Sequence, residues 1–346
     1  MDELFYSSLS YKLEQFAFFG EGTVPVGARL NVTGGLRYYD FDEDRSQIFD
    51  GIFGNDNTGT SLVSVPGATK AHGLAPRVMA SFKASDAVTL NAQASKGFRL
   101  GGINDPLNVP ICSAQDLTTF RGRDSWKDET AWNYEVGAKS TFMNGRASLN
   151  VAAYDMEIQD LQLTVTAGTC TSRLVFNVPK ARSSGLEVEL GATPNEHVEL
   201  SLNASMNNGQ LRSTLTSTDG SGNVSVVSGI KAGNRLPSVP RAQGAASATY
   251  RFSARRAGQP FVTTSVRYVG SRYTLIDDLA DGFGTVPLCI PEHDRRSADA
   301  EHIHVQSAAG GVHAGQCARG AASRHLGVRA VREQPDERGS AARARP

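Results

Sequence analysis

Apolar and polar residues alternate strictly between Gly185 and Gln210. A period of two places successive side chains on opposite faces of a β-strand. A Thr-Pro-Asn-Glu turn at 193–196 divides the segment, which therefore predicts a hairpin with one apolar face and one acidic, amide-rich face. The apolar positions are Leu186, Val188, Leu190, Val198, Leu200 and Leu202, and the acidic positions are Glu187, Glu189 and Glu199.

A hairpin with this pattern fits two kinds of fold. In a soluble sandwich the apolar face is buried in a core, whereas in a membrane barrel it faces lipid and the polar face lines a wet lumen. The same alternation predicts ten strands in five hairpins up to about residue 275. Connections within hairpins span a few residues, and those between hairpins span about 7 to 30, with loops expected at about 45–72, 99–129 and 211–237. Short and long connections in turn are typical of a membrane barrel, so we expect an all-β, antiparallel, partial transmembrane β-barrel in meander order.

Two further features of the strands bear on this prediction. After Ala153 the apolar positions change phase to Tyr154, Met156 and Ile158, which indicates either a β-bulge or a strand that has left the membrane. Aromatic residues gather near strand ends, which fits an interfacial girdle but also ordinary β-propensity. They are Tyr38, Tyr39, Phe98, Trp132, Tyr134, Tyr250, Phe252, Tyr268 and Tyr273.

Composition narrows the function classes. Lys plus Arg and Asp plus Glu are 35 each, so the formal net charge is zero and the basic footprint of a nucleic-acid-binding protein is missing. No apolar run approaches the roughly 18 residues of a membrane helix. The first residues, MDELFYSSLS, do not have the pattern of a signal peptide. An exported protein with this start would be a fragment or would begin at an internal position.

Four segments resemble the C-terminal barrel half of TonB-dependent outer-membrane receptors. They are SKGFRLGGIN (95–104), ETAWNYEVGAKSTFMNGRASLNVAAYDMEIQDLQL (129–163), NVPKARSSGLEVEL (177–190) and GNRLPSVPR (233–241), in the order found in the family. The resemblance covers about residues 10–275. It implies a barrel in the outer membrane of a Gram-negative cell, in contact with its lipid, that imports a scarce small ligand such as a ferric siderophore. Energy would come from the inner-membrane TonB complex.

The chain departs from the family pattern in several respects. Its residues match neither the plug domain nor the energy-coupling box, and ten strands are fewer than half of the family's 22. We therefore expect a receptor fragment that is not transport-competent alone. Two alternatives stay open: a passive barrel remnant in the outer membrane, and a soluble all-β binding module.

Candidate site residues are confined to the polar face and two loops. The acidic positions Glu187, Glu189 and Glu199 lack a neighbouring nucleophile, so a lumen wall is expected rather than an enzyme. Arg37, Arg77 and Arg267 would bind an anionic ligand or pair with these carboxylates in the lumen. The resemblance puts Cys112 and Cys170 in loops at one extracellular rim, where an oxidising environment favours a disulfide. No cofactor and no metal site is expected, because the His and Cys spacing matches no ligand set.

The pattern of strands ends near Val286. No Phe, Tyr or Trp follows Phe283, and nine arginines and five of the seven histidines follow Pro291. We therefore divide the chain into a barrel segment, 1–287, and an aberrant tail, 288–346, which is either disordered or the product of a shifted reading frame. The segment Leu326–Glu337 can be encoded so that the frame one base later reads WAYALYANNLTN, which resembles the family's penultimate strand.

Overall fold

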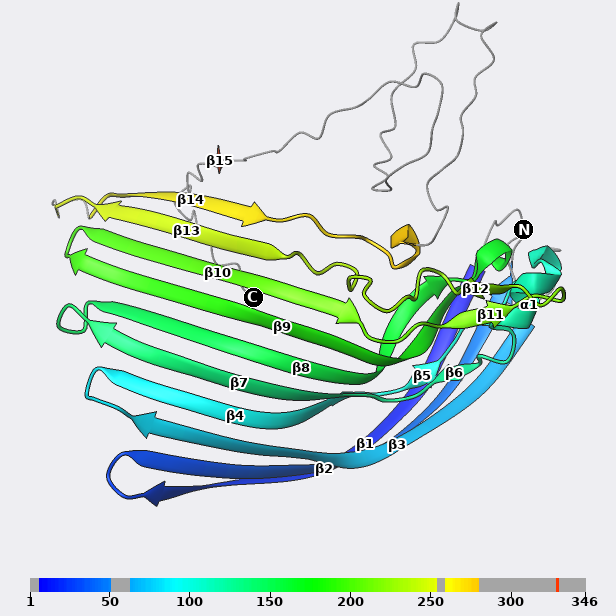
Figure 1. Cartoon of the computed structure of the whole chain (residues 1–346), viewed down its shortest axis with the longest axis horizontal. Coiled ribbons are helices and arrows are strands. Elements are labelled where there is room, and N and C mark those ends of the chain that lie inside the picture. The colour runs from blue at the N-terminus through cyan, green and yellow to red at the C-terminus, as the bar shows by residue number, and fades with distance from the viewer. Residues whose placement is uncertain (1–5, 51–62, 254–258, 280–327, 330–346) are drawn as a thin grey trace, which may run out of the picture.

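The computed structural model describes residues 6–50, 63–253, 259–279 and 328–329. They form one long, curved sheet with short helices and hairpins gathered at one end (Figure 1). The long strands are β1 (Tyr6–Val26), β2 (Leu30–Asp50), β3 (Val63–Lys83), β4 (Val88–Arg99), β7 (Glu129–Phe142), β8 (Ala147–Thr166), β9 (Arg173–Asn195), β10 (Val198–Leu211), β13 (Ala242–Arg251) and β14 (Phe261–Val269). The short elements are β5 (Gly102–Ile103), η1 (Val109–Ile111), α1 (Ala114–Phe120), β6 (Ser125–Trp126), η2 (Gly168–Cys170), β11 (Thr216–Thr218), β12 (Val224–Val226), η3 (Asp277–Leu279) and β15 (Val328–Arg329).

The ten long strands follow one another in chain order, and each pairs antiparallel with the next. β15 adds two residues beside β14. Within the described residues β1 and β14 do not pair with each other, so the sheet is open. The prediction of a partial, antiparallel, meander barrel is confirmed.

Short turns lie at one end of the sheet and long connections at the other (Figure 1). The turn between β7 and β8 is the Met-Asn-Gly sequence at 143–145, where all three residues have positive φ angles of 54°, 57° and 81°. Asn and Gly tolerate this conformation best, and it brings two strands together in a tight hairpin. The long connections, 100–128, 167–172 and 212–241, together with η3, are called the rim below.

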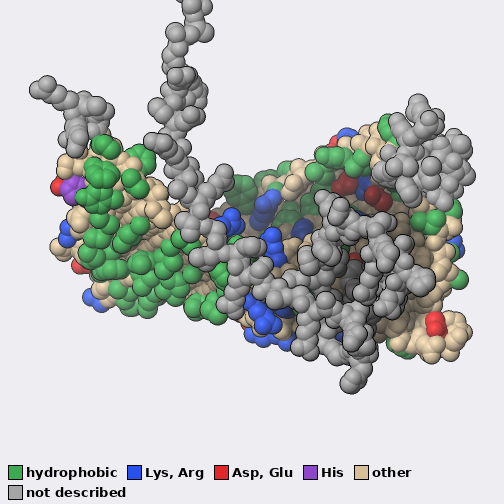
Figure 2. All heavy atoms as spheres, turned by 90° about the horizontal axis from the view of Figure 1, so that it is seen from above, with side chains coloured by type: hydrophobic (Ala, Val, Ile, Leu, Met, Phe, Trp, Pro, Cys, Tyr) green, Lys and Arg blue, Asp and Glu red, His purple; other side chains and the backbone are tan. Residues whose placement is uncertain are grey.

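Strand register separates two faces of the sheet. On what we call the apolar face, Val136, Ala153, Leu186 and Met206 are neighbours across four strands. The side chains of Leu186, Leu202 and Met206 are 41%, 39% and 63% exposed, and no second layer of described residues covers them. Figure 2 shows hydrophobic side chains gathered at the short-turn end of the molecule, with Lys and Arg nearer its middle. An uncovered apolar sheet face of this extent fits lipid contact better than the inside of a soluble sandwich.

The polar face carries the carboxylates and amides of the same strands. Glu189 lies between Asn150 on β8 and Asn203 on β10, and Glu187 lies opposite Ser205. These residues alternate with the apolar face, as the period of two requires.

The hydrophobic core of the described residues is at the rim and not in the middle of the sheet. Its buried members come from β8, β9, α1 and the loops, and Leu174, Phe176 and Leu211 are at most 1% exposed. Ile158 belongs to this core, and Met156 packs against it. The register of β7, β8 and β9 stays constant through this region, so the phase change after Ala153 is not a bulge. It marks the point where the inner face gains apolar neighbours.

The prediction of a loop over 45–72 is wrong at both ends. β2 continues to Asp50 and β3 begins at Val63, so the two strands pair well beyond the apolar stretch. Tyr39, Phe41 and Phe49 keep a period of two and are 3–4% exposed, while nearly all the residues between them are polar and half are acidic. The polar composition that indicated a loop belongs to strands that extend beyond the apolar band. The predicted tail, 288–346, lies outside the described residues except for Val328 and Arg329, so the domain division stays a prediction.

Candidate functional site: the polar face and the rim

Glu187 and Glu189 stand between two hollows on the polar face. One hollow, of about 440 Å³, extends toward β3 and includes Arg77 and Lys139 in its lining. The other, of about 320 Å³, extends toward β14 and includes Arg267. The two carboxylates therefore form a wall shared by both hollows.

Hydrogen bonds connect polar side chains on this face in two separate groups, one of which includes Glu189. Asn150 Nδ2 donates to Glu189 Oε2 at 3.3 Å. Arg77 donates to Glu21 at 3.4 Å and to Gln93 at 3.3 Å, and Gln93 donates to Glu135 at 3.3 Å. The arginines were predicted to bind an anion or to pair with the acidic positions, and Arg77 pairs instead with Glu21 on β1. Arg267 forms no ion pair with the described residues.

Two of the six predicted residues share this face by strand register but lie outside the two hollows. Glu199 accepts a hydrogen bond from Arg251 at 2.8 Å, close to the short turns. The guanidinium of Arg37 lies 5.7 Å from the centre of the Phe98 ring, near the start of the rim. The structure therefore brings together Glu187, Glu189, Arg77 and Arg267 along one wall and leaves Arg37 and Glu199 outside it.

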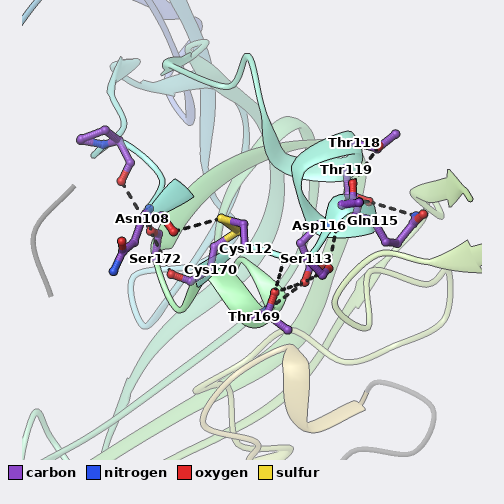
Figure 3. Close-up of a disulfide and its surroundings, with 12 residues drawn as sticks. Asn108, Cys112, Ser113, Gln115, Asp116, Thr118, Thr119, Thr169, Cys170 and Ser172 are labelled. Carbon is purple, nitrogen blue, oxygen red and sulfur yellow. Dashed lines mark hydrogen bonds between the residues drawn. A yellow bond between two sulfur atoms is a disulfide. The ribbon is translucent and has the colours of Figure 1, made fainter. Parts of the chain in front are cut away.

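A disulfide between Cys112 and Cys170 joins two rim segments that are 58 residues apart in sequence (Figure 3). It lies beside α1, whose first turn is capped by Ser113: the Ser113 hydroxyl accepts from the Asp116 amide at 3.1 Å. The Asp116 carboxylate in turn accepts from the amide and hydroxyl of Thr169 at 2.9 and 2.6 Å. Burial would raise the pKa of Asp116, but the hydrogen bonds from Thr169 and Ser113 outweigh it and lower the pKa. The disulfide and this carboxylate together hold α1 against η2.

Sequence reasoning missed a cavity at the rim. It measures about 560 Å³ and lies between α1, β12 and η3. Hydroxyl groups of Thr119, Ser217 and Ser225 and the apolar side chain of Phe120 line it. The Ser/Thr-rich composition of 211–237 was the available signal, but it indicated only a loop.

Asp277 places a carboxylate at the edge of this cavity. Its side chain is buried and accepts a hydrogen bond from the amide of Thr166 at 3.1 Å. Burial raises its pKa above the ordinary range, and the nearby charge of Asp278 adds to the effect. The cavity thus combines one buried acid, several hydroxyls and an apolar wall, which suits a small ligand with polar and apolar parts.

Among the residues that the structure describes, no helix is long and apolar enough to cross a membrane. No group of three or more His, Cys, Asp or Glu side chains in the same part of the chain could hold a metal ion.

Comparisons with known proteins agree with the fold. The chain is similar to the ferric yersiniabactin uptake receptor FyuA of Yersinia pestis, with 18% identity and a TM-score of 0.57, covering 79% of this chain and 37% of that one. It is similar to the ferric-catecholate import receptor Fiu of E. coli K12 (13% identity, TM-score 0.55, 76% and 35% covered). It is also similar to the siderophore receptor PiuA of Acinetobacter baumannii (14%, 0.51, 75% and 37%). The chain thus spans little more than a third of the length of these structures.

The family model described as "TonB dependent receptor-like, beta-barrel" matches residues 4–290. This range contains all ten long strands and the whole rim. The chain therefore belongs to the TonB-dependent receptor family and represents part of its β-barrel domain.

Proposed function

We propose that this chain is part of an outer-membrane receptor that takes up a scarce ligand, such as a ferric siderophore, with energy from the TonB complex. The proposal rests on one observation: a single sheet has an uncovered apolar face and a hydrogen-bonded polar face, and its long connections form a folded rim with a cavity. The similar structures include a ferric yersiniabactin uptake receptor and a siderophore receptor, which supports this ligand class. The polar face and the cavity would contact ligand without changing it chemically, so we propose no enzymatic role.

We further propose that the chain alone does not transport ligand. Among the described residues, β1 and most of β14 leave backbone groups along two open edges, and lipid cannot satisfy such groups, at a cost of several kcal/mol each. Complementary strands from a partner segment would be needed to close the barrel.

Fractionation and growth test this proposal together. The full chain is expressed with a secretion signal in a strain that lacks its siderophore receptors. We expect it in the outer-membrane fraction or in inclusion bodies, with no rescue of growth on ferric siderophore. Recovery in the soluble fraction would favour the soluble binding module, and growth rescue would contradict the claim that the chain is not transport-competent.

Ligand binding distinguishes a receptor segment from a passive barrel remnant. A receptor segment should retain ferric siderophore in detergent, and Asp277→Asn or a change at Ser217 should weaken that retention. Membrane insertion without any retention would favour the passive barrel.

A further inference from the structure

Three basic side chains share a hollow of about 310 Å³ next to the rim. They are Lys180 and Arg182 on β9 and Arg212 directly after β10. Glu157 and Gln159 on β8 complete the polar lining. None of these residues belongs to the polar face or to the rim cavity described above.

The hollow opens on the apolar face of the sheet. Lys180 and Arg182 share the alternation of Leu186 and Val188, and all four side chains leave β9 on the same side. On the opposite side, Ile158, Ala181 and Leu211 are buried in the rim core. The basic side chains are exposed, and they lie on the continuation of the apolar face toward the rim.

The order of residues along this face matches the order of layers in a bilayer. Side chains that are neighbours across the strands form rows on this face. From the short turns toward the rim, the rows are apolar up to the one that contains Val136, Leu186 and Met206. The next rows contain Tyr134 and Trp132, whose rings stack with centroids 6.2 Å apart. Aromatic rings of this kind lie at the membrane interface. The basic side chains occupy the rows of Trp132 and beyond, where head groups would be.

Distance along the strand supports the same placement. With Val188 taken as the middle of the apolar band, Lys180 is eight residues away, which is about 26 Å of strand at about 3.3 Å per residue. At a tilt of about 45° this corresponds to about 19 Å along the membrane normal, whereas half of the apolar band is about 12 Å. Lys180 and Arg212 would therefore lie just beyond the hydrocarbon.

Two of the three cations form no ion pair with the described residues. Arg182 donates to both oxygens of Asp155, at 2.6 and 2.8 Å. Lys180 and Arg212 have no such pair within the described part of the chain, and they face each other across the strands, since the Arg212 amide donates to the Lys180 carbonyl at 2.8 Å. The carboxylates of Asp155 and Glu157 lie nearby and offset part of this positive charge. Like charges directly opposite each other destabilise a sheet, and a bound anion would remove the remaining repulsion.

We propose that Lys180 and Arg212, supported by Arg182, bind the phosphate of an outer-leaflet lipid head group, with phosphorylated lipid A as the ligand. An Arg guanidinium can bind a phosphate through two parallel hydrogen bonds, and a Lys ammonium adds a point charge. The acyl chains would then lie against Leu186 and Met206. This inference rests on the proposed outer-membrane function, because it needs the apolar face to contact lipid.

The test uses the full chain refolded into phosphatidylcholine vesicles that contain a trace of dansyl-labelled lipid A. Energy transfer from the two tryptophans, Trp126 and Trp132, reports lipid A next to the protein. The variant is Lys180→Gln with Arg212→Gln, which leaves the Arg182–Asp155 pair intact. The matched control is Lys139→Gln with Arg267→Gln, which removes two cations from the polar face. We expect the apparent affinity for lipid A to fall about tenfold or more in the variant and to stay within about twofold in the control.

Further measurements distinguish lipid-bound phosphate from free phosphate, and test this inference separately from the proposed membrane function. Dephosphorylated lipid A should bind as weakly to the unchanged chain as lipid A does to the variant. Full competition by millimolar inorganic phosphate would show a simple anion site and overturn the lipid proposal. Equal binding by the unchanged chain and the variant, with the chain still resistant to a carbonate wash, would overturn this inference alone. Release of the chain by that wash would overturn both this inference and the proposed membrane function.

Discussion

Leu202 and Asn203 are neighbours in β10 whose side chains lie on opposite faces of the sheet. Leu202 pairs with Leu190 and Ala246, whereas Asn203 pairs with Glu189. If the apolar face contacts lipid, Leu202→Arg should cost roughly 2–4 kcal/mol of folding free energy in a bilayer. Asn203→Arg should cost much less, because the new guanidinium lies beside a carboxylate. Urea titration of the chain refolded in lipid vesicles measures both, and equal costs would argue against a lumen on the Glu187–Glu189 side.

Asp277 gives a prediction for pH dependence. Because burial raises the pKa of its carboxyl above the ordinary value of 3.8, the charged form destabilises the rim at neutral pH. That penalty disappears as the pH falls and the carboxyl is protonated. Asp277→Asn keeps an oxygen that accepts from the Thr166 amide, so it should unfold at a higher temperature than the unchanged chain at pH 7. This difference in unfolding temperature should shrink toward pH 3. A difference that stays constant between pH 7 and pH 3 would contradict the prediction.

The Cys112–Cys170 bond predicts how firmly α1 is held. The bond closes a loop of 58 residues, so its removal should destabilise the rim by about 2–5 kcal/mol. Non-reducing peptide mapping of refolded chain should recover both cysteines in one linked peptide. Cys112→Ser with Cys170→Ser should make the Ala114–Phe120 segment sensitive to protease, while β8 and β9 stay protected. Two free thiols in the unchanged chain would refute the pairing.

At the scale of elements, β8 and β9 show how one pair of strands serves two environments. Buried residues that otherwise recur every second position are here three positions apart: Ile158 and Leu161 on β8, and Val178 and Ala181 on β9. Burial thus changes phase on both strands at the same rung, where Asp160 has a φ of 53°. The register is preserved, so the pair can leave the apolar band and close over the rim core without a bulge.

The strands were predictable because a period of two survives wherever one face is apolar. The rim was not, because its core is built from contacts distant in sequence, such as the T-shaped pair of Phe120 with Phe176. Helix α1 did carry a local signal: Ser113 followed three residues later by Asp116 is a capping pattern. Of the candidate site, alternation predicted the common wall of Glu187 and Glu189. The ion-pair partners of Arg77 and Glu199 depend on cross-strand register, which the sequence alone does not specify.

At the scale of the whole molecule, the open sheet determines what the chain can do. Ten long strands pair in sequence, and in the described part of the chain the outer sides of β1 and of β14, apart from the two residues beside β15, are edges. An exposed edge is a template for pairing with another strand, in a partner segment or in an aggregate. The behaviour of the chain in membranes therefore depends on which strand pairs with the β14 edge.

Residues of the tail already occupy part of that edge. Val328 and Arg329 pair with Val266 and Ser265 of β14. These two tail residues lie within Leu326–Glu337, the segment whose frame one base later can read WAYALYANNLTN. That reading has the alternation and the aromatic side chains of a membrane strand, which the present tail lacks.

We therefore expect the gene to contain this run in the shifted frame, and a one-base correction upstream to give an aromatic-rich strand at the β14 edge. The corrected chain should show more β-structure by circular dichroism in lipid vesicles and less aggregation than the uncorrected chain. A chain corrected at an unrelated position, with the same length of tail, serves as the control. An early stop codon in the shifted frame, or a different reading at 326–337, would leave a genuine Ala/Arg/Gly-rich tail as the explanation of this sequence.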